Sequence, residues 1–156
     1  MEKQQPKELD KKEVDKKEAE KKDKAKVVIP KGRHAIEVSG TTFVVDEKYE
    51  FIKLIGHGAY GVVISAQNKK TGDKVAIKKV PNAFEDLIDA KRILREIKLL
   101  KFLEHDNIIA LVDLPRPEAR TGYNDIYIIT DLMETDLHRV IYSRQDLTDD
   151  HIQYFA

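Results

Sequence analysis

Cysteine is absent from this 156-residue sequence, which excludes a disulfide scaffold, a catalytic thiol and a cysteine-ligated metal. Long apolar runs are also absent, so no membrane-spanning segment or signal peptide is visible. The 28 basic and 28 acidic residues cancel, and a chain without net charge is not drawn strongly to nucleic acid or to membranes. The remaining composition, with 41% hydrophobic residues, predicts one soluble intracellular domain with a modest core.

Charged residues are concentrated at the N-terminus. Residues 1–26 contain ten lysines and eight acidic residues, and Leu9 and Val14 are their only sizeable apolar side chains. Such a segment cannot form a core, so we expect a charged tail that is disordered or transiently helical. In the next segment, residues 27–48, Ser39-Gly40 separates two alternating stretches, which predicts a hairpin from His34–Val38 and Thr41–Val45.

Three glycines in the segment Gly56-His57-Gly58-Ala59-Tyr60-Gly61-Val62-Val63 have the spacing of phosphate-binding turns. Glycines let backbone N–H groups approach phosphate oxygens, where a side chain would block them. The flanks, Tyr49–Ile55 and Val62–Ala66, are typical of strands. A dinucleotide-binding turn of an oxidoreductase would open a helix instead, which the β-branched residues after Gly61 disfavour. Taken alone, such a cluster is as often a hairpin turn without a ligand.

A lysine occupies the next predicted strand, Lys74–Val80, which returns antiparallel after a polar turn. Strand alternation places Ala76 and Lys78 on one face. Ala76 leaves room for a flat base, Val63 on the neighbouring strand can close the same pocket, and Lys78 can reach phosphate oxygens. The alternative, a solvated strand lysine, is the ordinary case and is our expectation for Lys79.

A helix is predicted after this strand. Asn82 can cap it, with Glu85 three residues on as in a capping box. Apolar residues then recur at helical spacing over residues 84–103. Glu96 lies toward the core-facing stripe, where a carboxylate needs a cation, and Lys78 is the cation that the strand offers. The alternative is a glutamate solvated at the rim of the stripe.

The order of glycine turn, strand lysine and helix glutamate resembles that of protein kinases. From about Phe43 to Ala156 the chain is closely similar to the mitogen-activated protein kinases. The finer match is carried by Ala59–Val63, Phe84 with Arg95-Glu96, Asp131–His138 and Leu147–Phe155. The resemblance implies an α+β fold with three parts. They are a kinase N-terminal lobe of five antiparallel strands plus a regulatory helix over 49–130, a hinge over 131–136, and the first helices of the C-terminal lobe over 137–156.

The resemblance also implies roles for individual residues. Lys78 would hold the ATP phosphates and Glu96 would lock Lys78 in the active kinase, so these two are the catalytic candidates. The residues expected around ATP are Ile55, Gly56, His57, Gly58, Ala59, Tyr60, Gly61, Val62, Val63, Ala76, Lys78, Thr130, Asp131, Met133 and Asp136.

The hinge would begin where the apolar run Ile126–Thr130 ends. By resemblance Thr130 is the gatekeeper, and its small side chain leaves a back pocket open to inhibitors. The backbone of Asp131 and Met133 would bond the adenine edge, and Asp136 would meet the ribose hydroxyls.

The H-R-D-x-x-x-x-N catalytic loop, the D-F-G metal site and the activation loop of kinases do not occur in this sequence. Arg92 and Arg95 match helix arginines that reach toward the phosphorylated activation loop of the family. Thr148 predicts the N-cap of a helix that has only about two turns before the sequence stops. We therefore expect a fragment, a splice product or a truncated gene model that is inactive by itself.

The family reaction transfers the γ-phosphoryl of ATP to Ser or Thr of proteins, with Mg²⁺ neutralising charge. No metal ligands are expected in this chain. The resemblance implies protein substrates and an upstream kinase as partners, and the cytoplasm and nucleus as the location. The alternative function is a non-catalytic kinase lobe that competes for scaffolds or partners.

Overall fold

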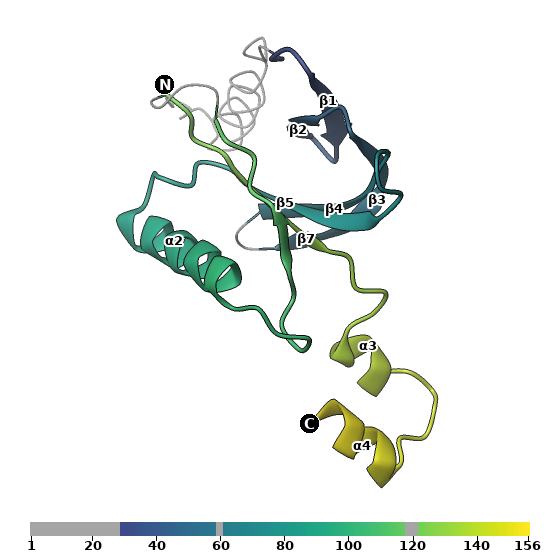
Figure 1. Ribbon diagram of the computed structural model, residues 1–156. Helices are drawn as coiled ribbons and strands as arrows, with labels where there is room; N and C mark the ends of the chain where they lie inside the picture. The colour runs from purple at the N-terminus through teal and green to yellow at the C-terminus, as the bar shows by residue number, and fades with distance from the viewer. Residues whose placement is uncertain (1–28, 59–60, 118–121) are drawn as a thin grey trace, which may run out of the picture.

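The computed structural model describes residues 29–58, 61–117 and 122–156. Residues 1–26, predicted to be a charged tail, lie outside this part of the chain, as do Ala59 and Tyr60 of the glycine turn. Figure 1 shows the arrangement of the described elements: a small hairpin, a larger sheet, one long helix beside the sheet, and two short helices that follow it.

The expected N-terminal hairpin is present. Strands β1 (Arg33–Val38) and β2 (Thr41–Asp46) pair antiparallel, with Val38 opposite Thr41. Between them Ser39 has φ 50° and Gly40 has φ 76°. A two-residue turn with both φ values positive matches the right-handed twist of the paired strands, which explains why these residue types stand there.

The main sheet has five antiparallel strands, as the resemblance implied, and their order is β3-β4-β5-β7-β6. Their bounds are β3 (Tyr49–Gly58), β4 (Gly61–Asn68), β5 (Lys74–Val80), β6 (Leu111–Asp113) and β7 (Ile126–Asp131). A helix separates β5 from β6 in sequence. After it the chain returns to the sheet, where β7 pairs with β5 although the two strands are far apart in sequence. This order places β5 at the centre of the sheet.

The hydrophobic core lies between the hairpin and the main sheet. Phe43 and Val45 of β2 pack with Ile64, Ile77 and Ile129 of the sheet, and all five side chains are buried. A smaller cluster on the opposite face joins the sheet to the long helix. The sheet is therefore covered on one face by the hairpin and on the other by the helix, which leaves β5 between two packed layers (Figure 1).

The two edge strands of the main sheet are joined by a polar contact. Lys48, just before β3, places Nζ 3.0 Å from Oδ2 of Asp113 in β6, and the hydroxyl of Tyr49 donates to the same oxygen at 3.1 Å. The hydrogen bond to Asp113 raises the pKa of Lys48, and burial raises the pKa of the Tyr49 phenol. Because β3 and β6 stand at opposite edges of the sheet, this contact holds the sheet in a curved form.

The long helix, α2 (Leu87–Phe102), begins later than the sequence predicted. Asp86 is its N-cap and accepts hydrogen bonds from the N–H groups of Ile88 and Asp89. The proposed cap at Asn82 is wrong because that residue has φ 50°, and residues 82–85 form a turn before the helix. Asn82 and Asp86 are both good capping residues by type, and only Asp86 has the extended backbone that a cap needs.

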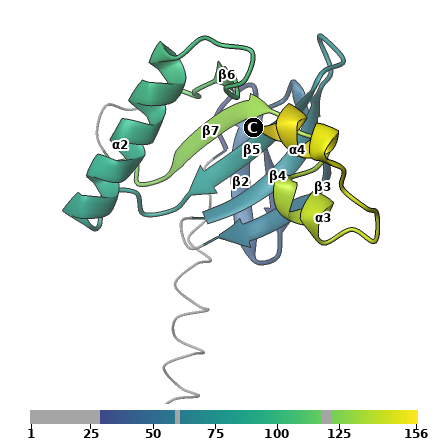
Figure 2. The same ribbon diagram turned by 90° about the horizontal axis from the view of Figure 1, so that it is seen from below.

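Two short helices follow β7: α3 (Leu137–Ile141) and α4 (Asp149–Phe155). The predicted cap of α4 is confirmed, because Thr148 Oγ1 accepts from the N–H of His151 and the imidazole Nδ1 accepts from the N–H of Thr148. Figure 1 shows all three helices on the side of the sheet away from the hairpin, and Figure 2 shows α2 toward the β7 edge and α3 and α4 toward β3 and β4. None of the helices in the described ranges is long and apolar enough to cross a membrane.

Candidate functional site

The centre of the candidate site is an ion pair between β5 and α2. Nζ of Lys78 lies 2.8 Å from Oε1 and 3.0 Å from Oε2 of Glu96. The two side chains are 29% and 41% exposed, so both groups remain accessible to a ligand. The partnership predicted from the helix stripe is therefore present, and the reading of Glu96 as a solvated rim residue is wrong.

Strand register gathers the other predicted side chains on the same face as Lys78. Residues directly opposite each other in an antiparallel pair project to the same side of a sheet. Val63 of β4 stands opposite Lys78, and Ala76 stands opposite Thr130 of β7. The sheet thus presents a small residue and two β-branched residues beside the cation, which is the surface predicted for a flat base.

The packing of α2 against this end of the sheet positions Glu96. Val80 at the end of β5 and Ala83 in the following turn are buried with Ile93 of the helix. Glu96 lies three residues after Ile93, about one helical turn along, and so lies on nearly the same side of α2. The apolar contact brings that side to the sheet, and the carboxylate reaches Lys78.

The glycine turn joins β3 and β4 as a strand-turn-strand unit. Gly56 pairs with Val63, His57 with Val62, and Gly58 with Gly61. A strand therefore follows the turn, which contradicts the dinucleotide-binding alternative, because that turn would open a helix.

The third glycine, Gly61, is required by the backbone around it. Its φ is 137°, and a Cβ on this residue would overlap the backbone carbonyl oxygen of Lys79. At Gly56, in contrast, an added Cβ would meet no atom within 4 Å. The two glycines are therefore present for different reasons: Gly61 lets β4 approach β5, and Gly56 leaves open space on the turn.

The predicted hinge residues lie at and after the end of β7. Thr130 is half-buried and its hydroxyl lies 3.3 Å from the carbonyl oxygen of Asp131, while Met133 is exposed. Asp136 is the N-cap of α3, where Oδ1 accepts from the N–H of Arg139 at 2.8 Å and Oδ2 lies 3.3 Å from its guanidinium Nε. A ribose would have to share this carboxylate with the helix cap, a second role that the sequence interpretation did not include.

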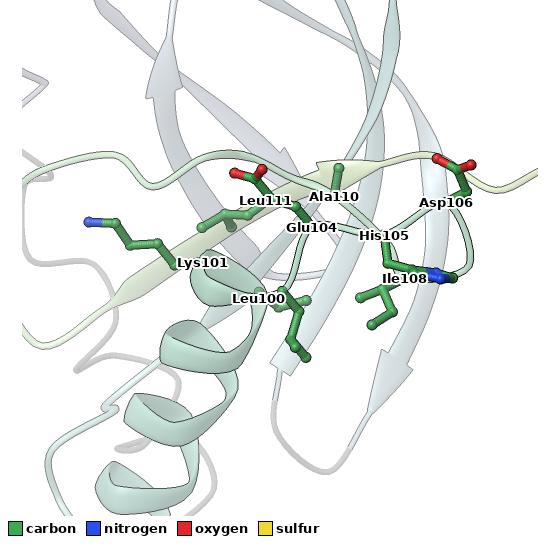
Figure 3. A pocket seen from close by; sticks show the side chains of 9 residues that line it. Leu100, Lys101, Glu104, His105, Asp106, Ile108, Ala110 and Leu111 are labelled. Atoms are coloured by element: carbon green, nitrogen blue, oxygen red, sulfur yellow. The ribbon is translucent and has the colours of Figure 1, made fainter.

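Several hollows lie near the site, and three of them border predicted residues. A cavity of about 460 Å³ is bordered by Ile55 of β3 and by Met133. A wider one of about 800 Å³ is bordered by Asp131 and Met133 and by the end of α4, and one of about 290 Å³ is bordered by Gly61. A hollow of about 500 Å³ at the C-terminal end of α2, between Leu100 and Leu111 (Figure 3), contains none of the residues predicted to contact a nucleotide, so it is not the predicted site.

Lys79 was expected to be a solvated strand lysine, and this expectation is wrong. Lys79 is 8% exposed, and its Nζ lies 2.8 Å from Oδ2 of Asp125 and donates to the carbonyl of Thr42 at 2.6 Å. Alternation along β5 could have indicated this burial, because Lys79 falls on the same face as the apolar Val75 and Ile77.

The helix arginine Arg92 lies at the exposed side of α2, where it pairs with Asp89 in the first turn at 3.3 Å. Arg95 is exposed one turn further on. The role expected for both, contact with a phosphorylated activation loop, remains a prediction because the sequence contains no such loop.

Comparison with known proteins identifies the family. The family model for the protein kinase domain matches residues 49–156, which includes β3 to β7 and the three helices described above. The chain belongs to the protein kinase family. The resemblance to mitogen-activated protein kinases is also confirmed by the relatives that this kinase chain matches.

Several relatives of this kinase chain share half or more of the aligned residues. Mitogen-activated protein kinase 6 of Oryza sativa subsp. japonica is 55% identical over 126 residues, which cover 80% of this chain and 34% of that protein. Mitogen-activated protein kinase 4 of Arabidopsis thaliana is 54% identical over 119 residues, covering 76% and 32%. Extracellular signal-regulated kinase 1 of Dictyostelium discoideum is 52% identical over 119 residues, covering 76% and 22%. The kinase chain thus spans about a third or less of the length of these relatives.

Proposed function

We propose that this chain supplies the ATP-binding half of a mitogen-activated-type serine/threonine protein kinase. The observation that carries the proposal is the Lys78–Glu96 ion pair, on the sheet face that also presents Val63, Ala76 and Thr130. A glycine turn one strand away adds backbone donors for phosphates. The family match supports the same assignment.

The residues present fit a nucleotide. An ammonium has three N–H donors, and the two oxygens of Glu96 accept at most two of those of Lys78, which leaves a donor for a phosphate oxygen. Gly56 has open space where a side chain would stand, so the turn backbone can approach a phosphate. ATP, when bound, supplies the phosphoryl group that the family transfers.

Each group of the site would act on the nucleotide by position and charge. Lys78 would attract the phosphate oxygens, and Glu96 would hold the ammonium in place so that it does not turn to solvent. Val63 and Ala76 would contact the base, and the backbone of the segment after β7 would bond its edge. These contacts orient the nucleotide and do not by themselves transfer a phosphoryl group.

The chain by itself is proposed to be inactive in phosphoryl transfer. In the kinase template the Mg²⁺ ligands and the group that accepts the substrate proton stand in the D-F-G and H-R-D-x-x-x-x-N segments. Neither segment occurs in these 156 residues. Transfer to serine or threonine of substrate proteins, activation by an upstream kinase, and a location in cytoplasm and nucleus are proposals for a protein that contains the whole kinase domain.

The alternative function that we propose is that of a non-catalytic kinase lobe. A kinase lobe that retains its fold and lacks catalytic groups can occupy scaffolds or partners of the complete kinase without phosphorylating them. Detection of this 156-residue form as a stable protein in cells would favour that function, and its absence from cells would count against it.

The test is phosphate transfer from labelled ATP to a peptide that contains Ser-Pro, by a version of the protein that includes the rest of the kinase domain. Lys78→Met should abolish transfer, because the phosphate contact is lost. Lys69→Met is the matched control, since Lys69 is an exposed lysine in the turn between β4 and β5. Transfer retained in Lys78→Met, or lost equally in both variants, would contradict the proposal.

A further inference from the structure

Lys79 is a buried cation next to the candidate site that has no part in the function proposed above. Its Nζ lies 2.8 Å from Oδ2 of Asp125 and 2.6 Å from the carbonyl oxygen of Thr42, and 5.8 Å from the centre of the Tyr127 ring. Burying a charged group is costly unless partners of this kind compensate for the lost water. The contacts of Lys79 therefore join β5 to two segments that are distant from it in sequence.

The first of these segments is the β1–β2 hairpin. Thr42 belongs to β2, and the N–H of Val44 on the same strand donates to the hydroxyl of Tyr127 at 3.1 Å. The ring of Phe43 lies 6.2 Å from that of Tyr127. Lys79 thus stands at the point where the hairpin meets β5 and β7.

The second segment lies just before β7, at Asp125, which also holds the turn that leads from β5 into α2. The other carboxylate oxygen of Asp125 accepts from the N–H of Asn82 at 3.3 Å. The N–H of Ala83 donates to the carbonyl of Asn124 at 2.7 Å. One carboxylate, on Asp125, therefore contacts both the buried lysine and the turn that sets where α2 begins.

The third connection is to the nucleotide side of the sheet. Lys78 and Lys79 are adjacent on β5, so their side chains project to opposite faces. The backbone carbonyl of Lys79 lies where a Cβ on Gly61 would stand. A displacement of the Lys79 backbone would therefore also move Lys78, which pairs with Glu96, and β4, which carries the third glycine.

We propose that Lys79 is a positioning residue for the nucleotide site. Its contacts with Asp125 and Thr42 fix β5 and the turn before α2, and so set the distance between Lys78 and Glu96. Through the side chain of Lys79, the position of the hairpin also affects the affinity of the site for a nucleotide. This inference rests on the proposed function, because it assumes that Lys78 and Glu96 hold a nucleotide.

A second ion pair in the same lobe gives a matched control. Lys48 and Asp113 lie 3.0 Å apart with side chains 24% and 35% exposed, and the Lys79–Asp125 pair has values of 11% and 35%. Both pairs are made by a lysine close to the hairpin, since Lys48 follows β2 by two residues and Lys79 contacts Thr42 of β2. The Lys48 pair reaches the edge strand β6, whereas Lys79 lies on β5 itself, so only the Lys79 pair adjoins Lys78.

The experiment compares Lys79→Met with Lys48→Met in the 156-residue chain at about 10 °C, near the usual temperature of maximum stability. Far-UV circular dichroism verifies that each variant is folded. Affinity for N-methylanthraniloyl-ATP with Mg²⁺ is then measured by fluorescence. We expect Lys79→Met to weaken binding by about fivefold or more, the lower range of coupling between sites. Lys48→Met should change it by less than about twofold.

Two further variants separate positioning from a merely structural role. Lys79→Arg keeps a cation that can reach Asp125 and should restore most of the affinity that Lys79→Met loses. The double variant Lys79→Met with Asp125→Asn should bind no more weakly than the weaker single variant, because both changes break one contact. Additive losses, or no rescue by arginine, would overturn the proposal.

Unchanged affinity in a folded Lys79→Met chain would also overturn it, as would an equal loss in Lys48→Met. If the unchanged chain binds no nucleotide, the proposed function fails for this chain, and hydrogen exchange then decides the inference. Faster exchange at Ala83 and in α2 of Lys79→Met, with slow exchange kept in Lys48→Met, supports positioning by Lys79. Equal exchange in the two variants contradicts it.

Discussion

Replacing Gly61 with alanine should destabilise the lobe even when no nucleotide is present. The residue has φ 137°, a backbone conformation that costs a non-glycine residue about 1–3 kcal/mol. Its new Cβ would also overlap the carbonyl oxygen of Lys79, which belongs to the backbone and cannot rotate away. Strand β4 must then move from β5, and each weakened ladder hydrogen bond costs about 1 kcal/mol. The sum is about 3 kcal/mol, a large part of the stability of a small domain.

The assay is urea unfolding followed by far-UV circular dichroism. With a slope of about 1–3 kcal/mol per M, a loss of about 3 kcal/mol moves the midpoint down by about 1–3 M. Gly56→Ala is the control, because an added Cβ there meets no atom within 4 Å. It should leave the midpoint nearly unchanged. Equal midpoints for Gly61→Ala and the unchanged chain would refute the argument that β4 and β5 need a glycine at this point.

Four further predictions concern the site, the polar contact between the edge strands, and the chain as a whole. In a version of the protein with a complete kinase domain, Lys78→Met should lower kcat by about 10²-fold or more. Because its ion pair with Glu96 is partly exposed, the free energy of unfolding should fall by no more than about 1 kcal/mol, and a larger fall would show that Lys78 is structural. Thr130→Met should block ligands that occupy the back pocket and keep ATP affinity within a few fold; equal loss of both in competition binding would exclude the gatekeeper role. The pKa values of Lys48 and Tyr49 are raised on folding, so the folded state holds these protons more tightly and the stability they add is lost as pH rises above about 10. Urea titrations should show this decline flattened in Tyr49→Phe, and an equally steep decline would contradict the assignment. The purified 156-residue chain should transfer no label from ATP to a Ser-Pro peptide beyond its own Lys78→Met variant, and turnover above that control would disprove the proposed inactivity.

The strands around the site were predictable because the alternation of side chains and the residue types of the turns indicate the same strand bounds. The bounds predicted for β5, Lys74 to Val80, are those of the structure. The strand residues after Gly61 were indicated by β-branched side chains, which are restricted at χ1 and favour an extended backbone. The partnership of Lys78 and Glu96 followed from one physical requirement, that a carboxylate on a half-buried helix face needs a cation.

The start of α2 was not predictable from the same reasoning. Asn82 and Asp86 both offer a capping oxygen, and their backbone conformations, φ 50° at Asn82 and extended at Asp86, distinguish them. The turn around Asn82 is also bonded to a segment about forty residues away, through the N–H of Ala83 and the carbonyl of Asn124. The short strand β6 has three residues, too few for a period to be visible. These elements are set by tertiary contacts that no local pattern contains.

The burial of Lys79 shows the same limit at a single residue. A lysine considered alone is expected at the surface, and its partners Thr42 and Asp125 are 37 and 46 positions away in sequence. Asp136 is a different case, because its carboxylate caps α3 through the N–H of Arg139, only three positions away. For Lys79 the missing information was a contact with distant parts of the chain, whereas the cap at Asp136 is a local feature that its residue type could have indicated.

The most direct test of the central claim is a titration of the ¹⁵N-labelled 156-residue chain with ATP and Mg²⁺, followed by amide chemical shifts. This method maps weak binding residue by residue. The account predicts the largest shift changes at Ala76, Lys78 and Met133, and their loss in Lys78→Met. Leu100 and Leu111, at the hollow shown in Figure 3, should not move. Shift changes confined to that hollow, or the same changes in Lys78→Met as in the unchanged chain, would contradict the claim that this lobe holds the nucleotide at Lys78.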